Sequence, residues 1–322
     1  MTSIFVCNQK GLKAIKKEEL LSNLNKKSNN LWVHIPKYSN EQANMLKEFF
    51  KIHPTTIEDI FSEQTQIKYE ELEDYQVIIF RGIERIRKKT VETYNISFII
   101  GKNFVITINS EGSDAIASLV KNDKKIESIL KKGTKYLVHY VLDKEVDKYL
   151  KIKSELNENL NQVEMEFMKH QNKEILTKIY SKELIFLELR HLSELTTDLC
   201  SNLKKLAENP LDRDLVYYFK DIYDHALKTK EGYEAILKRT EGIEEWYATM
   251  TNLKTTEVMR ALTIIMALMM PLTIITGFYG MNVALPLQNN PHASFYIFLA
   301  LIISAALMFF FSKKAGWIPK KE

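Results

Sequence analysis

RALTIIMALMMPLTIITGFYGMNVALPLQNNPHASFYIFLALIISAALMFFFSKK, residues 260–314, is the stretch that decides how this chain folds. Residues 261–290 contain no charged side chain, although 27% of the whole sequence is charged. A helix needs about 20 apolar residues to cross a hydrocarbon core of about 30 Å. Residues 258–278 and 293–312 meet that length, so we predict two transmembrane helices joined by a loop at residues 279–292.

The distribution of positive charge predicts the orientation of these spans. Lys254 and Arg260 flank the start of the first span, and the loop carries only His292. The tail at residues 313–322 is basic through Lys313, Lys314, Lys320 and Lys321. Lysine and arginine concentrate on the cytoplasmic side of a membrane. We therefore expect an inner- or plasma-membrane protein in contact with lipid, with both termini and the basic tail in the cytoplasm.

Residues 1–135 mix strand-like runs with amphipathic helical stretches, which predicts a cytoplasmic α/β domain. β-branched and aromatic residues favour strands. Five runs have this composition, at residues 4–7, 31–35, 75–83, 94–100 and 103–109. Residues 101–103 should form the turn of a hairpin between the last two runs. Ser39 precedes a helical pattern and has the side chain of an N-cap.

Long helices follow this domain. Residues 136–209 contain two stretches without glycine, which predict an antiparallel pair of outer helices turning near residues 169–173. Asn209-Pro210 should end the second of them.

Within residues 211–257, mostly apolar side chains recur every seven positions, which predicts a heptad-like stalk helix. The two repeating series are Leu215, Ile222, Thr229, Ile236, Ile243 and Met250, and Phe219, Ala226, Tyr233, Thr240 and Tyr247. No proline occurs between Leu211 and Pro271, so one helix can run from the stalk into the first span. We expect a homo-oligomer whose central helices continue into a bundle in the membrane.

The sequence offers little support for catalysis or nucleic-acid binding. The lysine-rich run at residues 121–135 is interrupted by Asp123 and Glu127 and has no aromatic platform, so we interpret it as a solvated helix face. The seven histidines show no HExxH spacing, and no CxxC or phosphate loop occurs. We therefore expect no catalytic residue, no enzyme activity, no organic cofactor and no nucleic-acid partner.

A stripe of residues three or four positions apart runs along the first predicted span. Its members are Thr256, Met259, Leu262, Met266, Met270, Thr273 and Gly277. This spacing places them on one face of a helix. They could serve ordinary helix packing, because methionine fills gaps well. Around a symmetric pore, the same stripe would form a narrow apolar tube that gates by dewetting.

Tyr279-Gly280-Met281-Asn282 directly follows the first span. Gly-Met-Asn alone is a weak motif, but its place between two spans adds context. Together with Met-Pro-Leu-Thr at residues 270–273 and Lys-Lys-Ala-Gly-Trp at residues 313–317, it resembles the end of the CorA family of magnesium channels. Upstream, His53-Pro54 and Glu58-Asp59 resemble the corresponding pairs of that family.

The resemblance implies a funnel-shaped homopentamer that passes hydrated Mg2+ down its electrochemical gradient. The first span would line the pore, the second would face lipid, and Gly280, Met281 and Asn282 would form the selectivity filter. Mg2+ gives up water reluctantly. Five neutral Asn282 amides could therefore bind the hydrated ion weakly enough to conduct.

The resemblance also implies regulation by intracellular Mg2+. The ion would bridge carboxylates of neighbouring subunits and hold the pore shut, and Asp59 and Asp221 match these positions. Two departures stand out: Thr256 replaces the asparagine of many relatives, and Pro286-Leu287 replaces a Pro-Glu pair in the loop.

Two alternatives remain at the level of sequence. A channel of the same superfamily could carry Co2+, Ni2+ or Zn2+, but zinc favours nitrogen and sulfur ligands and the stripe offers only methionine thioethers. A membrane-anchored coiled-coil scaffold would explain the heptads and spans without any conduit. That alternative leaves the loop unexplained and predicts that replacing Asn282 changes nothing.

Overall fold

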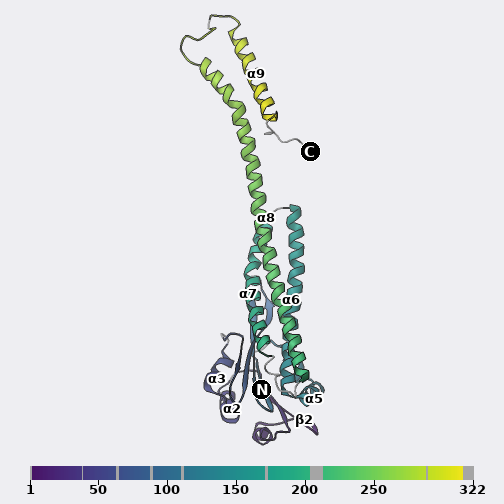
Figure 1. Cartoon of the computed structure of the whole chain (residues 1–322). Helices are drawn as coiled ribbons and strands as arrows, with labels where there is room; N and C mark the ends of the chain where they lie inside the picture. Colours follow the sequence, from purple (N-terminus) through teal and green to yellow (C-terminus); the bar gives the residue numbers. More distant parts are fainter. Residues whose placement is uncertain are drawn as a thin grey trace. The chain divides into compact units, whose positions relative to one another are not determined.

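The computed structural model describes residues 2–37, 39–62, 65–87, 90–109, 112–170, 173–203, 213–287 and 289–314. The chain divides into two compact units, Met1–Gly242 and Ile243–Glu322 (Figure 1).

A single mixed sheet of seven strands, counted over the described residues, organises the first unit. Its strands are β1 (Ser3–Asn8), β2 (Gly11–Ala14), β3 (Asn30–Ile35), β4 (Lys68–Glu71), β5 (Gln76–Ile86), β6 (Val91–Ile100) and β7 (Phe104–Asn109). Their order is β2-β1-β3-β7-β6-β5-β4, and only β3 and β7 pair in parallel. All five predicted runs are strands. The two unpredicted ones, β2 and β4, are four-residue edge strands without an apolar run, so the search for such runs misses them.

The sheet is covered on both faces because its strands alternate. In β3, Leu31, Val33 and Ile35 join the core formed with α2 (Asn40–Phe50) and α3 (Pro54–Phe61). The intervening Trp32 and His34 lie on the opposite face, as period-two alternation requires. There, Thr107 Oγ1 accepts a 2.9 Å hydrogen bond from Trp32 Nε1 and lies 3.0 Å from His34 Nδ1. Ser39 caps α2 as predicted, accepting from the backbone N–H of Gln42.

Short helices complete the α/β domain. They are the 3-10 helix η1 (Lys17–Glu19), α1 (Leu20–Leu24), α4 (Asp114–Val120) and α5 (Asp123–Lys132). The lysine-rich run corresponds to α5, which buries Ile126, Ile129 and Leu130 and exposes its lysines, in agreement with a solvated helix face.

Three long helices follow: α6 (Thr134–His170), α7 (Lys173–Leu203) and α8 (Arg213–Tyr279). The predicted outer pair corresponds to α6 and α7, which pack on one another (Figure 1). Both the turn between them and Asn209-Pro210 lie outside the described residues.

Most of the predicted heptad residues of α8 are buried within one chain, whereas Tyr247 and Met250 are half-buried. Leu215, Phe219, Ile222, Ala226, Thr229, Tyr233, Ile236 and Thr240 are all at most 2% exposed. The Tyr233 hydroxyl donates a hydrogen bond to the Tyr149 carbonyl of α6 at 3.3 Å, and Arg239 forms an ion pair with Glu164, which also lies on α6. Because the helices of the same chain fill this seam, the heptads do not by themselves require a second copy.

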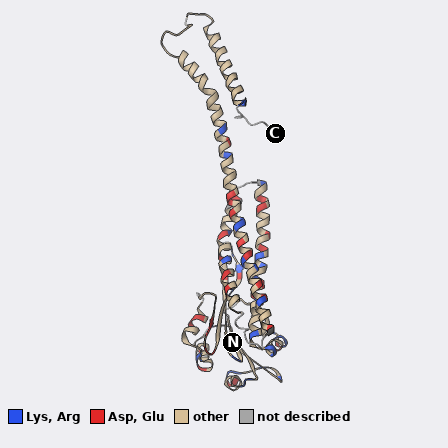
Figure 2. Cartoon of the chain, in the orientation of Figure 1, with Lys and Arg blue, Asp and Glu red and all other residues tan. Residues whose placement is uncertain are grey.

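The second unit contains the C-terminal part of α8 and α9 (Ala293–Lys314). Both helices are long and apolar enough to cross a membrane, with mean hydropathies of 2.1 and 2.4 over their most apolar windows. Figure 2 shows acidic and basic residues all along α6 and α7, whereas the last part of α8 and the helix α9 contain very few. These helices therefore cover the predicted spans at residues 258–278 and 293–312.

Candidate functional site

The predicted stripe is exposed along its entire length. Thr256, Met259, Leu262, Met266, Met270, Thr273 and Gly277 are all exposed, and its four large apolar side chains are between 53% and 64% exposed. The half-buried residues of this segment are Ile264, Ala267, Leu268, Pro271, Leu272, Ile275 and Tyr279. At 3.6 residues per turn, the centres of the two sets lie roughly 165° apart around the helix. The stripe thus lies on the side of α8 that its own chain leaves uncovered.

Threonine hydroxyls stand near both ends of this stripe. Thr256 Oγ1 donates to the Asn252 carbonyl and Thr273 Oγ1 donates to the Met269 carbonyl, both at 2.9 Å. A hydroxyl has one proton and two lone pairs. Because each proton is held by the backbone four residues earlier, each hydroxyl can act only as an acceptor toward solvent.

The loop begins where α8 ends, at Tyr279. The Gly280 N–H still bonds the Thr276 carbonyl at 2.9 Å, and an added Cβ at Gly280 would lie 3.1 Å from that same oxygen. Glycine therefore suits this tight exit from the helix. Met281 and Asn282 follow, and both are exposed.

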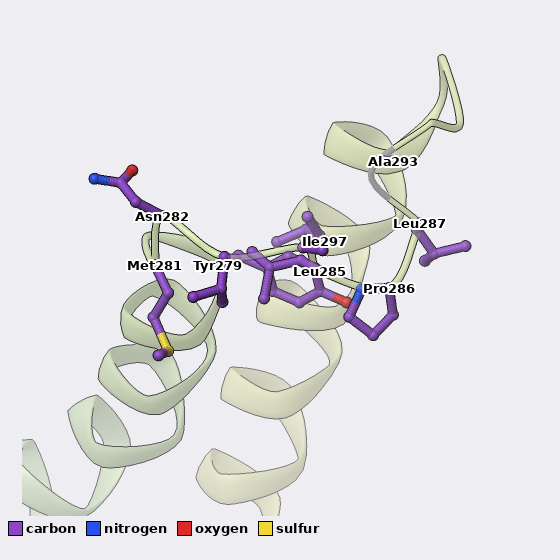
Figure 3. Close-up of a pocket in the computed structure, with 10 residues that line it drawn as sticks. Tyr279, Met281, Asn282, Leu285, Pro286, Leu287, Ala293 and Ile297 are labelled. Atoms are coloured by element: carbon purple, nitrogen blue, oxygen red, sulfur yellow. The ribbon is translucent and has the colours of Figure 1, made fainter.

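Figure 3 shows that the Asn282 amide points away from the loop, whereas Met281 points back along α8. Among the described residues, Asn282 has no side-chain hydrogen-bond partner. An open hollow of about 560 Å³ lies between this loop and the start of α9, bordered by residues that include Tyr279, Leu285, Pro286 and Ile297. No charged side chain lines it, so this hollow offers a cation only neutral dipoles.

The two predicted regulatory carboxylates occupy different surroundings. Asp59 lies in α3, where its Oδ2 is 2.7 Å from Lys68 Nζ. Asp221 lies in α8, where its side chain is 63% exposed and its Oδ1 is 3.9 Å from His225 Nε2. No hydrogen bond or ion pair joins Asp59 to Asp221 within the described part of one chain.

A cluster that sequence reasoning missed lies beside Asp221. Asp143 and Asp147 of α6 and His225 of α8 each offer one ligand atom, and these atoms all lie within 4.8 Å of one another. His225 Nδ1 is 3.4 Å from Asp147 Oδ1, is buried, and makes no hydrogen bond to any described residue. Carboxylates suit Mg2+, whereas an added imidazole suits Co2+, Ni2+ and Zn2+. The arrangement can therefore hold a divalent cation.

Lys144 supplies the positive charge near this cluster. Its Nζ lies 3.6 Å from Asp143 and 3.3 Å from Asp147. The hydrogen bond to Asp147 raises the pKa of Lys144 above its ordinary value. A metal ion entering the cluster would consequently displace an ammonium group.

The basic tail is described only in part. Lys313 and Lys314 are exposed in the last turn of α9, which is the end of a helix that favours positive charge. Lys320 and Lys321 lie outside the described residues, as does the Ala-Gly-Trp that completes the tail motif.

These features define a class of membrane protein that has an α/β soluble domain, long helices and two apolar C-terminal helices joined by an uncharged loop. The family described as CorA-like Mg2+ transporter protein matches residues 27–314. The chain belongs to this family of transporters of Mg2+ and other divalent metals.

Relatives cover most of the chain. The cobalt/magnesium transport protein CorA of Thermotoga maritima is 26% identical over 291 residues, which are 89% of this chain and 83% of that protein. Its namesake in Methanocaldococcus jannaschii is 24% identical over 89% of this chain and 91% of that protein. The complete structure of the CorA magnesium transporter from Methanocaldococcus jannaschii superposes with a TM-score of 0.76 over 99% of both chains at 20% identity. At that identity the structural likeness establishes the fold alone.

Proposed function

We propose that this protein is a homopentameric Mg2+ channel of the inner or plasma membrane, with both termini in the cytoplasm. The observation that carries the proposal is the uncovered face of α8, which leads without a charged side chain to the outward-pointing Asn282. Five copies of α8 around an axis would use this face as the pore wall. The half-buried face would then pack against α9, whose outer side would meet lipid.

Selection at the loop would depend on weak binding. Mg2+ keeps several waters when bound and prefers oxygen ligands. Asn282 has a free amide oxygen that can accept hydrogen bonds from these waters, and the Gly280 carbonyl could help. A neutral amide binds a dication less tightly than a carboxylate would, so the ion can leave again.

The membrane potential would drive uptake without a nucleotide. A dication that crosses an inside-negative potential of roughly 100 mV gains about 4.6 kcal/mol, which is twice the value for a single charge. Among other cargoes, Co2+ is the second candidate, because the relatives carry cobalt in their names.

We further propose that intracellular Mg2+ closes the channel by bridging Asp59 of one subunit and Asp221 of its neighbour. Support comes from the exposure of both carboxylates, at 41% and 63%, and from the acceptor-rich Asp143, Asp147 and His225 beside Asp221. Loss of the ion would leave like charges facing one another across the interface. Their repulsion would loosen the closed ring.

The test is Mg2+ uptake into dye-loaded proteoliposomes under an inside-negative potential. Asn282→Ala should abolish most of the uptake, because the filter loses its amide oxygens. The matched control is Asn289→Ala, which removes an exposed amide from the same loop. Equal uptake by wild type and Asn282→Ala would reject the filter. Absence of uptake by folded wild-type protein at low internal Mg2+ would favour the scaffold.

A further inference from the structure

Lys68 of β4 is held between two carboxylates. Its Nζ lies 2.7 Å from Asp59 Oδ2 and 2.8 Å from Glu70 Oε1. The Lys68 side chain is 26% exposed, less than those of Asp59 and Glu70, at 41% and 44%. Asp59 comes from α3 and Glu70 from β4, so the fold of the α/β domain brings the three groups together.

The ammonium group occupies the place that a small cation would take. Both oxygens are within 2.8 Å of one nitrogen, so a cation replacing that nitrogen would reach both after the two carboxylates move inward. Mg2+ binds such oxygens at about 2.0–2.1 Å. Burial lowers the pKa of Lys68, but hydrogen bonds to Asp59 and Glu70 outweigh this effect and raise the pKa. The amine is therefore charged at neutral pH.

We propose that Lys68 is a built-in competitor for the divalent cation at Asp59. Its ammonium group neutralises the carboxylate in the resting chain, repels an arriving dication and so raises the Mg2+ concentration needed to close the channel. This inference rests on the proposed regulation through Asp59. It adds a residue on the chain's own β4 that sets the affinity of that regulation.

Several contacts that do not use the Lys68 side chain hold this region in place. The Thr65 hydroxyl donates to the Asp59 carbonyl at 2.9 Å, and Arg81 Nη2 donates to the Thr65 carbonyl at 3.0 Å. Backbone pairing of Lys68 with Ile79 also continues whatever the side chain. A neutral side chain of similar length should therefore leave α3 and β4 in place.

The experiment compares variants of the full chain in two assays. The first measures the Mg2+ concentration that half-protects detergent-solubilised protein from limited proteolysis, and the second measures the internal Mg2+ that half-inhibits flux in proteoliposomes. Lys68→Met should lower both midpoints about three- to tenfold, because an ammonium competing at a partly exposed carboxylate has an effect of that order. Lys68→Arg, which keeps the charge, should stay near wild type.

The control variant is Lys17→Met, which removes an ammonium from the exposed pair with Glu41 in the same unit and should move neither midpoint. Adding Asp59→Asn to Lys68→Met should abolish the lowering of the two Mg2+ midpoints, because the carboxylate that binds the ion is then missing. Midpoints that are unchanged or higher in Lys68→Met would overturn the inference while leaving the regulation intact. Wild-type protein without any Mg2+ dependence would overturn both.

Discussion

The Tyr94 hydroxyl donates a 2.6 Å hydrogen bond to Glu145 Oε2, which ties β6 to α6. Glu145 is 2% exposed, and its other oxygen accepts from Ser113 Oγ at 2.6 Å. The Tyr94 ring fills the space beside Gly82 and Gly112, where an added Cβ would lie 2.4 and 2.6 Å from ring atoms. Burial raises the pKa of Glu145, and the two hydrogen bonds oppose that rise. The buried Glu145 carboxyl group is thus stabilised by its two hydrogen-bond donors, Tyr94 and Ser113.

Removing the Tyr94 hydroxyl should therefore destabilise the soluble unit. We expect Tyr94→Phe to lower the free energy of unfolding by about 1–3 kcal/mol, because a buried acceptor loses its donor. Denaturant unfolding of the full chain in detergent, followed through the buried Trp32, measures this change. Tyr180→Phe alters an exposed ring and is the control. If both variants unfold at the same denaturant concentration, the hydrogen bond between Tyr94 and Glu145 contributes nothing to the free energy of unfolding.

Acid should weaken the same unit through His34. Burial lowers the pKa of His34 to about 4, although its contact with Thr107 opposes the shift. The unfolded value is about 6.5, so between these pH values the unfolded chain binds more protons. This contribution to stability is complete above pH 6.5 and declines by up to about 3 kcal/mol as the pH falls toward 4.

The melting temperature between pH 7 and 4 measures that decline. His34→Asn should remove part of the slope, whereas replacement of the exposed His292 should not. Identical slopes in wild type and His34→Asn would show that His34 titrates as freely in the folded chain as in the unfolded one.

If the stripe lines the proposed pore, polar substitutions on it should prevent closure by dewetting. Leu262→Ser and Met266→Ser should raise Mg2+ flux severalfold at internal Mg2+ concentrations that close the wild type, because a wetted tube no longer excludes the hydrated ion. Ile265→Ser is the control, since Ile265 is 57% exposed but lies off the stripe. An equal rise in all three variants would contradict a pore along this face.

The cluster beside Asp221 should distinguish metals. His225→Gln removes its imidazole and should weaken Co2+ binding on the order of tenfold, while Mg2+ binding changes less than about twofold. Thermal shifts of the full chain against each metal measure this, with the exposed His191→Gln as control. A parallel loss for both metals would mean that His225 supports the fold instead of ligating.

Much of the membrane part could be predicted because its signals are local. Apolar length, the spacing of three or four residues from Met259 to Gly277, and the position of Gly-Met-Asn are all properties of consecutive residues. The strands of the sheet were readable for the same reason wherever they are buried. The edge strand β4 could not be predicted, because its sequence, Lys-Tyr-Glu-Glu, is mostly charged and lacks the apolar residues of a buried strand.

Contacts between distant segments could not be predicted in this way. Asp143 and Asp147 are one turn apart on α6, as are Asp221 and His225 on α8, but only the packing of the two helices brings them together. The ion pair of Lys68 with Asp59 likewise joins two different elements, β4 and α3. The heptads of α8 were correctly recognised as a seam, yet the pattern does not say which helix fills it, and α6 of the same chain does.

The hydroxyls of Thr256 and Thr273 have a consequence for the sign of the charge that can pass. Each hydroxyl already donates its hydrogen bond to a backbone carbonyl, so neither can donate one to a chloride or phosphate ion in the proposed pore. The hydrogens of the water around a cation, by contrast, point outward and find oxygen lone pairs there. In the proposed pore these two rings would reject anions without a single ionised side chain, which leaves the membrane-spanning wall free of the cost of burying charge.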